Sequence, residues 1–144
     1  AGMTDVSLKV PGDLLRRVFV LLDRLLEGAH QARLLGKAGK GSCDEMQSAI
    51  GSFESTLAFV QHTEEFRCCR AGAAPPSSQH VKESFLRKLI EKASAASKQM
   101  DEGLANAAGL VPASMASSLK RSCQDLESSL SQLRACLQPP TAPS

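Results

Sequence analysis

Apolar residues recur every three or four positions over most of the chain, with polar residues between them. This spacing is typical of helices that bury one face. It occurs in four segments, which are separated by stretches rich in glycine and proline. The sequence therefore predicts four amphipathic helices, over residues 13–36, 43–69, 79–108 and 112–137.

The apolar positions of each segment form a single stripe, and in the second segment they follow heptad spacing without a break. We expect these stripes to meet in one core. Their members are Leu15, Val18, Leu22, Leu25 and Ala29, then Met46, Ile50, Phe53, Leu57 and Val60, then Leu86, Leu89, Ala93, Ala96, Met100, Leu104 and Ala107, and finally Met115, Leu119, Ser122, Leu126, Leu130, Leu133 and Leu137.

The helix starts carry recognisable capping residues. Asp13 is a favourable N-cap for the first helix, and Ser42 followed by Glu45 forms a capping box for the second. Pro112 suits the first position of the fourth helix, where its missing N–H leaves no hydrogen bond unmade. These signals support the predicted starts.

The four segments have similar lengths, and the connections between them are short. Connections of this kind favour antiparallel neighbours. We therefore expect an all-α protein, an antiparallel up-down-up-down four-helix bundle over residues 13–137. Residues 1–12 are predicted to form a short extended arm or linker, with Ala1 and Gly2 as a cloning remnant, and the proline-rich residues 138–144 a disordered tail.

Charge and composition restrict the class of partner. Lys and Arg number 17 and Asp and Glu number 15, balanced between the two halves of the chain, and Trp and Tyr are absent. Nucleic-acid binding surfaces need a one-signed patch and stacking aromatics, so no nucleic-acid partner is expected. The longest apolar run, Val18–Leu22, is too short to predict a membrane span. Five cysteines, an odd number, with Cys68 and Cys69 adjacent, favour a reducing, cytoplasmic location.

No motif predicts catalysis. The glycines between Gly36 and Ser42 lack the lysine position of a phosphate-binding loop. Glu27 and His30 match the Glu-x-x-His motif of di-metal bundles, but that motif must occur twice and here it occurs once. We therefore expect a protein that is not an enzyme, with no catalytic residue, no metal and no cofactor.

Some apolar residues lie outside the predicted core stripes. Phe59 and Phe66 fall on the opposite side of the second helix, with His62 between their turns. On the first helix, Leu21 lies at the margin of the stripe and Val20 lies among charged residues. The two phenylalanines could be covered by the loop 71–78 or by the N-terminal arm, bind an amphipathic partner helix, or mediate self-association.

We therefore expect a non-catalytic protein-protein interaction module, an adaptor or scaffold bundle that presents a hydrophobic helix face to a partner helix or peptide. The candidate partner-binding residues are Phe59, His62, Phe66, Val20 and Leu21. The predicted architecture is similar in general shape to focal-adhesion-targeting and other adaptor bundles. The alternative is a lipid-responsive bundle that opens as apolipoprotein-like bundles do, although no basic face borders an apolar one here.

Overall fold

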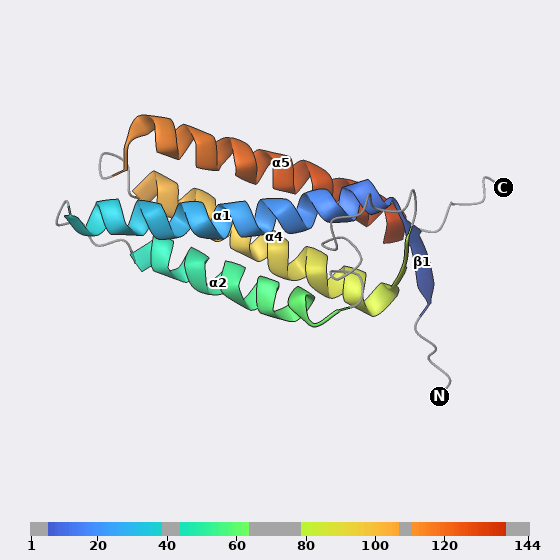
Figure 1. Cartoon of the computed structure of the whole chain (residues 1–144). Coiled ribbons are helices and arrows are strands. Elements are labelled where there is room, and N and C mark those ends of the chain that lie inside the picture. The colour runs from blue at the N-terminus through green and yellow to red at the C-terminus, as the bar shows by residue number, and fades with distance from the viewer. Residues whose placement is uncertain (1–5, 39–43, 64–78, 107–110, 138–144) are drawn as a thin grey trace.

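Four long helices lie side by side, and successive helices run in opposite directions (Figure 1). The computed structural model describes residues 6–38, 44–63, 79–106 and 111–137. The helices are α1 (Gly12–Ala38), α2 (Asp44–Gln61), α4 (Glu83–Asn106) and α5 (Ala113–Leu137). Each packs against two neighbours, so that α1 and α4 each lie between α2 and α5. The predicted all-α four-helix bundle is confirmed.

Among the described residues, the core is formed largely by the apolar stripes read from the sequence, while the side chains of Met46 and Ala107 lie outside the described part. Leu15, Leu22, Phe53, Leu89 and Leu126 are among its largest fully buried side chains. Leu104, Met115 and Leu137 are partly buried against the same cluster near helix ends. Because polar residues fill the outer side of each helix, no helix in the described ranges is both long and apolar enough to cross a membrane.

A small antiparallel sheet closes one end of the bundle. Strand β1 (Ser7–Val10) pairs with β2 (Gln79–Lys82), and Leu8 lies opposite Val81. Val10 and Val81 are both buried in the core. The extended arm is thus part of the fold, and the helix predicted from residue 79 begins only at Glu83. Pairing with β1 gives the backbone of β2 hydrogen bonds that a first helical turn would otherwise make.

The second helix is shorter than predicted. It ends at Gln61, where both the backbone N–H and the hydroxyl of Thr63 donate hydrogen bonds to the carbonyl of Val60, at 3.0 and 2.6 Å. Two donors on one late carbonyl close the turn locally. The predictions for residues 1–2, for the loop 71–78 and for the tail 138–144 lie outside the described residues.

Candidate partner-binding surface

The ring of Phe59 lies against the protein's own α4. It stacks on Phe85, with ring centroids 5.4 Å apart and an interplanar angle of 23°. The ammonium of Lys88 lies over the same ring, 5.2 Å from its centroid. Phe59 is therefore partly buried and packed on the core through α4, and the loop 71–78 predicted as a possible cover lies outside the described residues.

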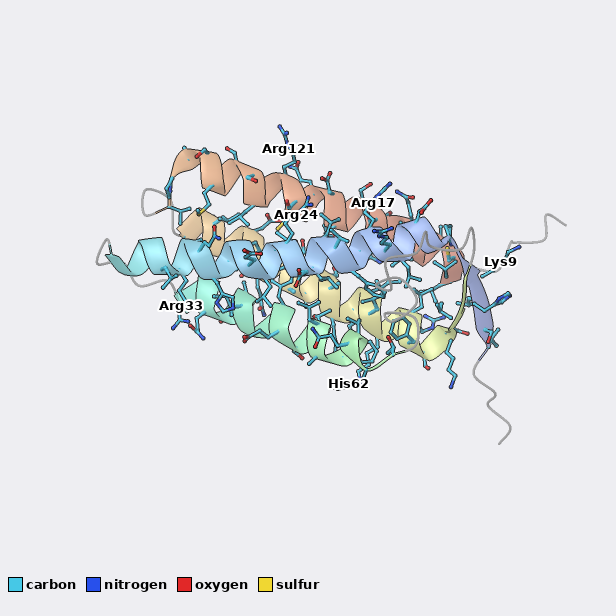
Figure 2. The ribbon with its side chains drawn as sticks, in the orientation of Figure 1. Lys9, Arg17, Arg24, Arg33, His62 and Arg121 are labelled. Atoms are coloured by element: carbon cyan, nitrogen blue, oxygen red, sulfur yellow. The ribbon has the colours of Figure 1, made fainter. Side chains whose placement is uncertain are left out.

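Two other candidates on this side do not join Phe59 in a described surface. His62 is exposed and lies just beyond the end of α2 (Figure 2). Phe66 lies outside the described residues. The stripe expected from Phe59, His62 and Phe66 is therefore represented in the structure only by the partly covered ring of Phe59.

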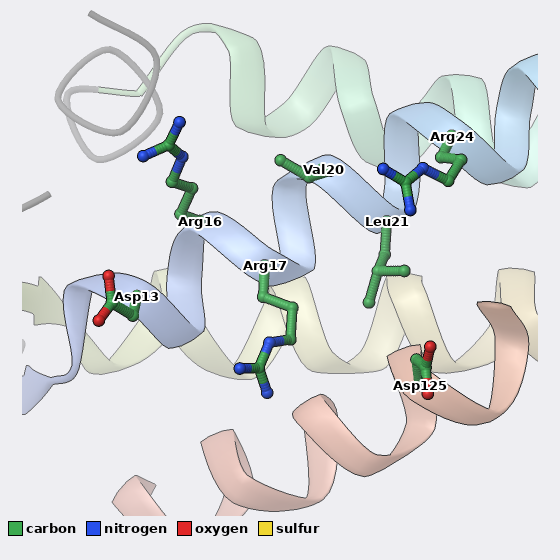
Figure 3. Close-up of a pocket in the computed structure, with 7 residues that line it drawn as sticks. All are labelled: Asp13, Arg16, Arg17, Val20, Leu21, Arg24 and Asp125. Carbon is green, nitrogen blue, oxygen red and sulfur yellow. The ribbon is translucent and has the colours of Figure 1, made fainter. Parts of the chain in front are cut away.

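Val20 and Leu21 of α1 lie together at an open pocket of about 630 Å³ (Figure 3). Val20 is 43% exposed, whereas Leu21 is only 5% exposed and belongs to the edge of the core. The pocket is lined by Asp13, Arg16, Arg17, Val20, Leu21 and Arg24 of α1 and by Asp125 of α5. The structure thus brings two of the predicted residues to one concave surface, which charged side chains also line.

Three arginines line this pocket. Within the described part of the chain, Arg16, Arg17 and Arg24 make no ion pair or hydrogen bond. Figure 3 shows that Arg16 and Arg17 leave α1 on opposite sides, with Arg17 and Leu21 extending toward α5. Charged donors therefore leave α1 both on the side of Val20 and on the side of Leu21. We call the surface formed by these seven lining residues the arginine pocket.

Sequence reasoning identified Val20 but missed the arginine pocket as a unit. Arg17, Leu21 and Arg24 are spaced by four and three residues, which places them on one strip of the helix. That spacing was the available signal. Asp125 comes from α5, far along the chain, and only the packing of α5 beside α1 brings it here.

A second groove, of about 450 Å³, lies between α2 and α4, but its polar groups already bind one another. The Ser52 hydroxyl donates to the side-chain oxygen of Gln99 at 2.5 Å, and the Lys92 ammonium donates to the Ser55 hydroxyl at 3.0 Å. A ligand would have to replace these bonds. The arginine pocket carries no such internal hydrogen bonds between described residues and is the stronger candidate.

The thiols in the described ranges are not poised for reaction. Cys123 and Cys136 are free. Burial raises the pKa of the Cys123 thiol from its ordinary value of 9.0 to about 12, the charge of Asp101 adds to the rise, and the nearby Ser97 hydroxyl opposes it. Because the thiolate is the nucleophile, such a cysteine is inert at neutral pH. Among the described residues, no group of three or more His, Cys, Asp or Glu side chains is placed to hold a metal ion.

Comparisons with known proteins add no further assignment. No protein-family model matches the chain, and no curated protein and no solved structure matches it.

Proposed function

We propose that this chain is a non-catalytic protein-interaction module, in which the four-helix bundle is a rigid scaffold and α1 presents the binding surface. The observation that carries the proposal is Val20, a 43% exposed apolar side chain that lines the arginine pocket among charged residues. Concave surfaces with an apolar centre and a polar rim are typical of peptide-binding sites. The partner is another protein that contributes a helix or a peptide segment.

The rest of the molecule supports this role. The buried apolar residues of all four helices form one core, so binding at the outer surface of α1 leaves the bundle intact. A surface built on a helix of a packed bundle is held in place before the partner arrives, which reduces the entropy lost on binding. The odd number of cysteines, two of them adjacent, favours the cytoplasmic location that we propose for this chain.

The proposal is tested by site-specific crosslinking in cells of the source organism. The photoreactive residue p-benzoylphenylalanine replaces Val20 in one chain and the exposed Glu91 of α4 in a control chain. We expect position 20, and not position 91, to crosslink to a discrete protein. Excess chain without the photoreactive residue should compete for that protein. Equal crosslinking from both positions, or none from position 20, would contradict the proposal.

A further inference from the structure

We propose that the segment bound at the arginine pocket is an acidic amphipathic helix, with carboxylates on either side of an apolar residue. This inference rests on the proposed function and specifies the chemistry of its partner. The apolar residue covers Val20 and the exposed edge of Leu21. The carboxylates pair with Arg17 and Arg24.

The first reason is the chemistry of the three guanidinium groups. Each has no partner among the described residues, although each lies within one or two helical turns of Val20. A guanidinium presents its N–H donors as a planar fork that matches the two oxygens of a carboxylate. Carboxylates are therefore the side chains that best complete this surface.

The second reason is the spacing of the donors. Arg17 and Arg24 are one heptad apart, which corresponds to a separation of about 10 Å along α1, and Leu21 lies between them. A helix packed along α1 meets both arginines if its own carboxylates are also one heptad apart. An apolar residue midway between these carboxylates then falls at Val20 and Leu21. The predicted pattern of the partner is Glu or Asp at position i, an apolar residue at i+3 or i+4, and Glu or Asp at i+7.

The third reason is the distribution of charge over the bundle. The sequence of α1 holds five basic and three acidic residues, whereas that of α2 holds three acidic residues and no basic one. The sequence of α1 thus carries a formal charge of +2 and that of α2 a charge of −3, although the whole chain carries only +2. Complementary charge favours approach of an acidic partner to α1 and disfavours a basic one.

The carboxylates at the arginine pocket favour a ligand with discrete charges. Asp13 and Asp125 also line it, so it is a mixed surface and not a uniform basic patch. A phosphate backbone or an anionic membrane places negative charge against these carboxylates as well as against the arginines, whereas a helix can place its carboxylates at Arg17 and Arg24 alone. A membrane would also find little to bind, because the large hydrophobic side chains that are exposed in the described residues are Val6, Val20 and Leu34, which form no continuous apolar face.

The test uses the whole chain and two fluorescein-labelled synthetic peptides of about 20 residues, long enough for a helix of about 30 Å. Binding is measured by fluorescence anisotropy. One peptide carries leucines at its apolar positions and glutamates one heptad apart, and the other has lysine at every glutamate. We expect the acidic peptide to bind at least tenfold more tightly than the basic one, and more weakly as salt is raised. No binding of the acidic peptide, or equal binding of both, would overturn the proposal.

Paired variants locate the binding. Arg17→Glu with Arg24→Glu should weaken binding of the acidic peptide at least tenfold. Lys82→Glu with Lys98→Glu, an equal change of net charge at exposed positions of β2 and α4, should leave it within twofold. Circular dichroism checks that each variant is folded. If the Arg17→Glu, Arg24→Glu chain is unfolded, Arg17→Gln with Arg24→Gln replaces it. Equal effects of the two pairs would overturn the proposal.

The apolar part is tested on α1 itself. Val20→Ser should weaken binding severalfold, while Leu34→Ser, at a side chain 68% exposed on the same helix, should not. Equal effects would contradict the assignment of Val20 as the apolar contact. Vesicles with and without anionic lipid test a membrane as the ligand. If the chain binds the anionic vesicles and Arg17→Glu with Arg24→Glu abolishes that binding, the ligand of the arginine pocket is a membrane and the proposal is overturned.

Crosslinking separates this inference from the proposed function. The Arg17→Glu, Arg24→Glu chain is given the photoreactive residue at position 20 and returned to cells. Loss of the crosslinked partner supports an acidic segment. If the partner still crosslinks, the chain is an interaction module but the acidic segment is wrong. If the chain with Arg17 and Arg24 unchanged and the photoreactive residue at position 20 crosslinks to no protein, the proposed function itself fails.

Discussion

Leu119 of α5 fills the space beside Gly28 of α1, so that a β-carbon at Gly28 would overlap the end of the Leu119 side chain. Leu119 is itself buried. The absence of a side chain at Gly28 thus permits the close approach of α1 and α5, the two helices that frame the arginine pocket.

A matched pair of glycine substitutions tests this contact. Gly51→Ala, in α2 with nothing within 4 Å of an added β-carbon, should raise the free energy of unfolding by up to about 1 kcal/mol, because alanine favours a helix. Gly28→Ala has the same helical benefit but displaces Leu119, and overpacking costs about 1 to 3 kcal/mol. In urea titrations, the free energy of unfolding of Gly28→Ala should be lower than that of Gly51→Ala by that amount. Equal stability would show that Leu119 moves aside freely.

The buried hydroxyl of Ser129 is expected to reduce stability. It is 1% exposed, and its oxygen has no hydrogen-bond partner in the described structure. An unsatisfied buried polar group costs about 1 to 3 kcal/mol. Ser129→Ala should therefore raise the free energy of unfolding by about 1 kcal/mol or more relative to Ser128→Ala, its exposed neighbour with the same gain in helix propensity. A gain no larger than that of Ser128→Ala would mean that the Ser129 hydroxyl finds a partner in solution.

The Cys123 thiol should make stability depend on pH in the alkaline range. Its pKa is raised to about 12 in the folded protein, so the unfolded chain loses this proton first. The stability of the wild type relative to Cys123→Ala is therefore constant below pH 9 and falls as the pH rises from 9 toward 12. At pH 10.5 the relative loss should be about 2 kcal/mol.

Urea titrations with reductant at pH 7.5 and 10.5 measure this difference. Cys136→Ala is the comparison, because burial raises the pKa of that thiol but leaves it partly exposed, and its pH dependence should be smaller. A Cys123 effect no larger than that of Cys136 would contradict the buried position of Cys123.

The contact between Phe59 and Phe85 is measurable as a coupling energy. Stacked aromatic pairs contribute about 0.5 to 1.5 kcal/mol beyond the area they bury. A double-mutant cycle with Phe59→Leu, Phe85→Leu and the double variant should give a coupling energy in that range. A coupling near zero would show that the ring of Phe59 is free of α4 in solution and would reopen Phe59 as a partner-binding residue.

The core and its helices were predictable because the information is local. Heptad spacing places Ile50, Phe53 and Leu57 on one side of a helix whatever packs there, and the structure buries all three. The strands were not predictable in the same way. The alternation around Leu8 indicates an extended segment, but its partner Val81 lies in a distant segment whose sequence also fits a helix. Pairing between distant segments decides that conformation.

The candidate surface shows a similar limit. The helical pattern places Phe59 away from the core stripe of α2, but it does not show that Phe85 of α4 stacks on that side. It places Leu21 at a margin, where α5 then covers most of it. An angle around a helix axis can be read from the sequence, whereas the neighbour that covers a side chain depends on how the helices pack.

The most direct test of the account is an NMR titration of the ¹⁵N-labelled chain with the acidic amphipathic peptide. The account predicts that amide shifts concentrate at the arginine pocket, at Arg17, Val20, Leu21 and Arg24 of α1 and Asp125 of α5, while Phe59 and Lys88 stay unchanged. Shifts centred on Phe59 and His62 instead, or no shifts at any peptide concentration, would contradict the claim that α1 carries the partner-binding surface.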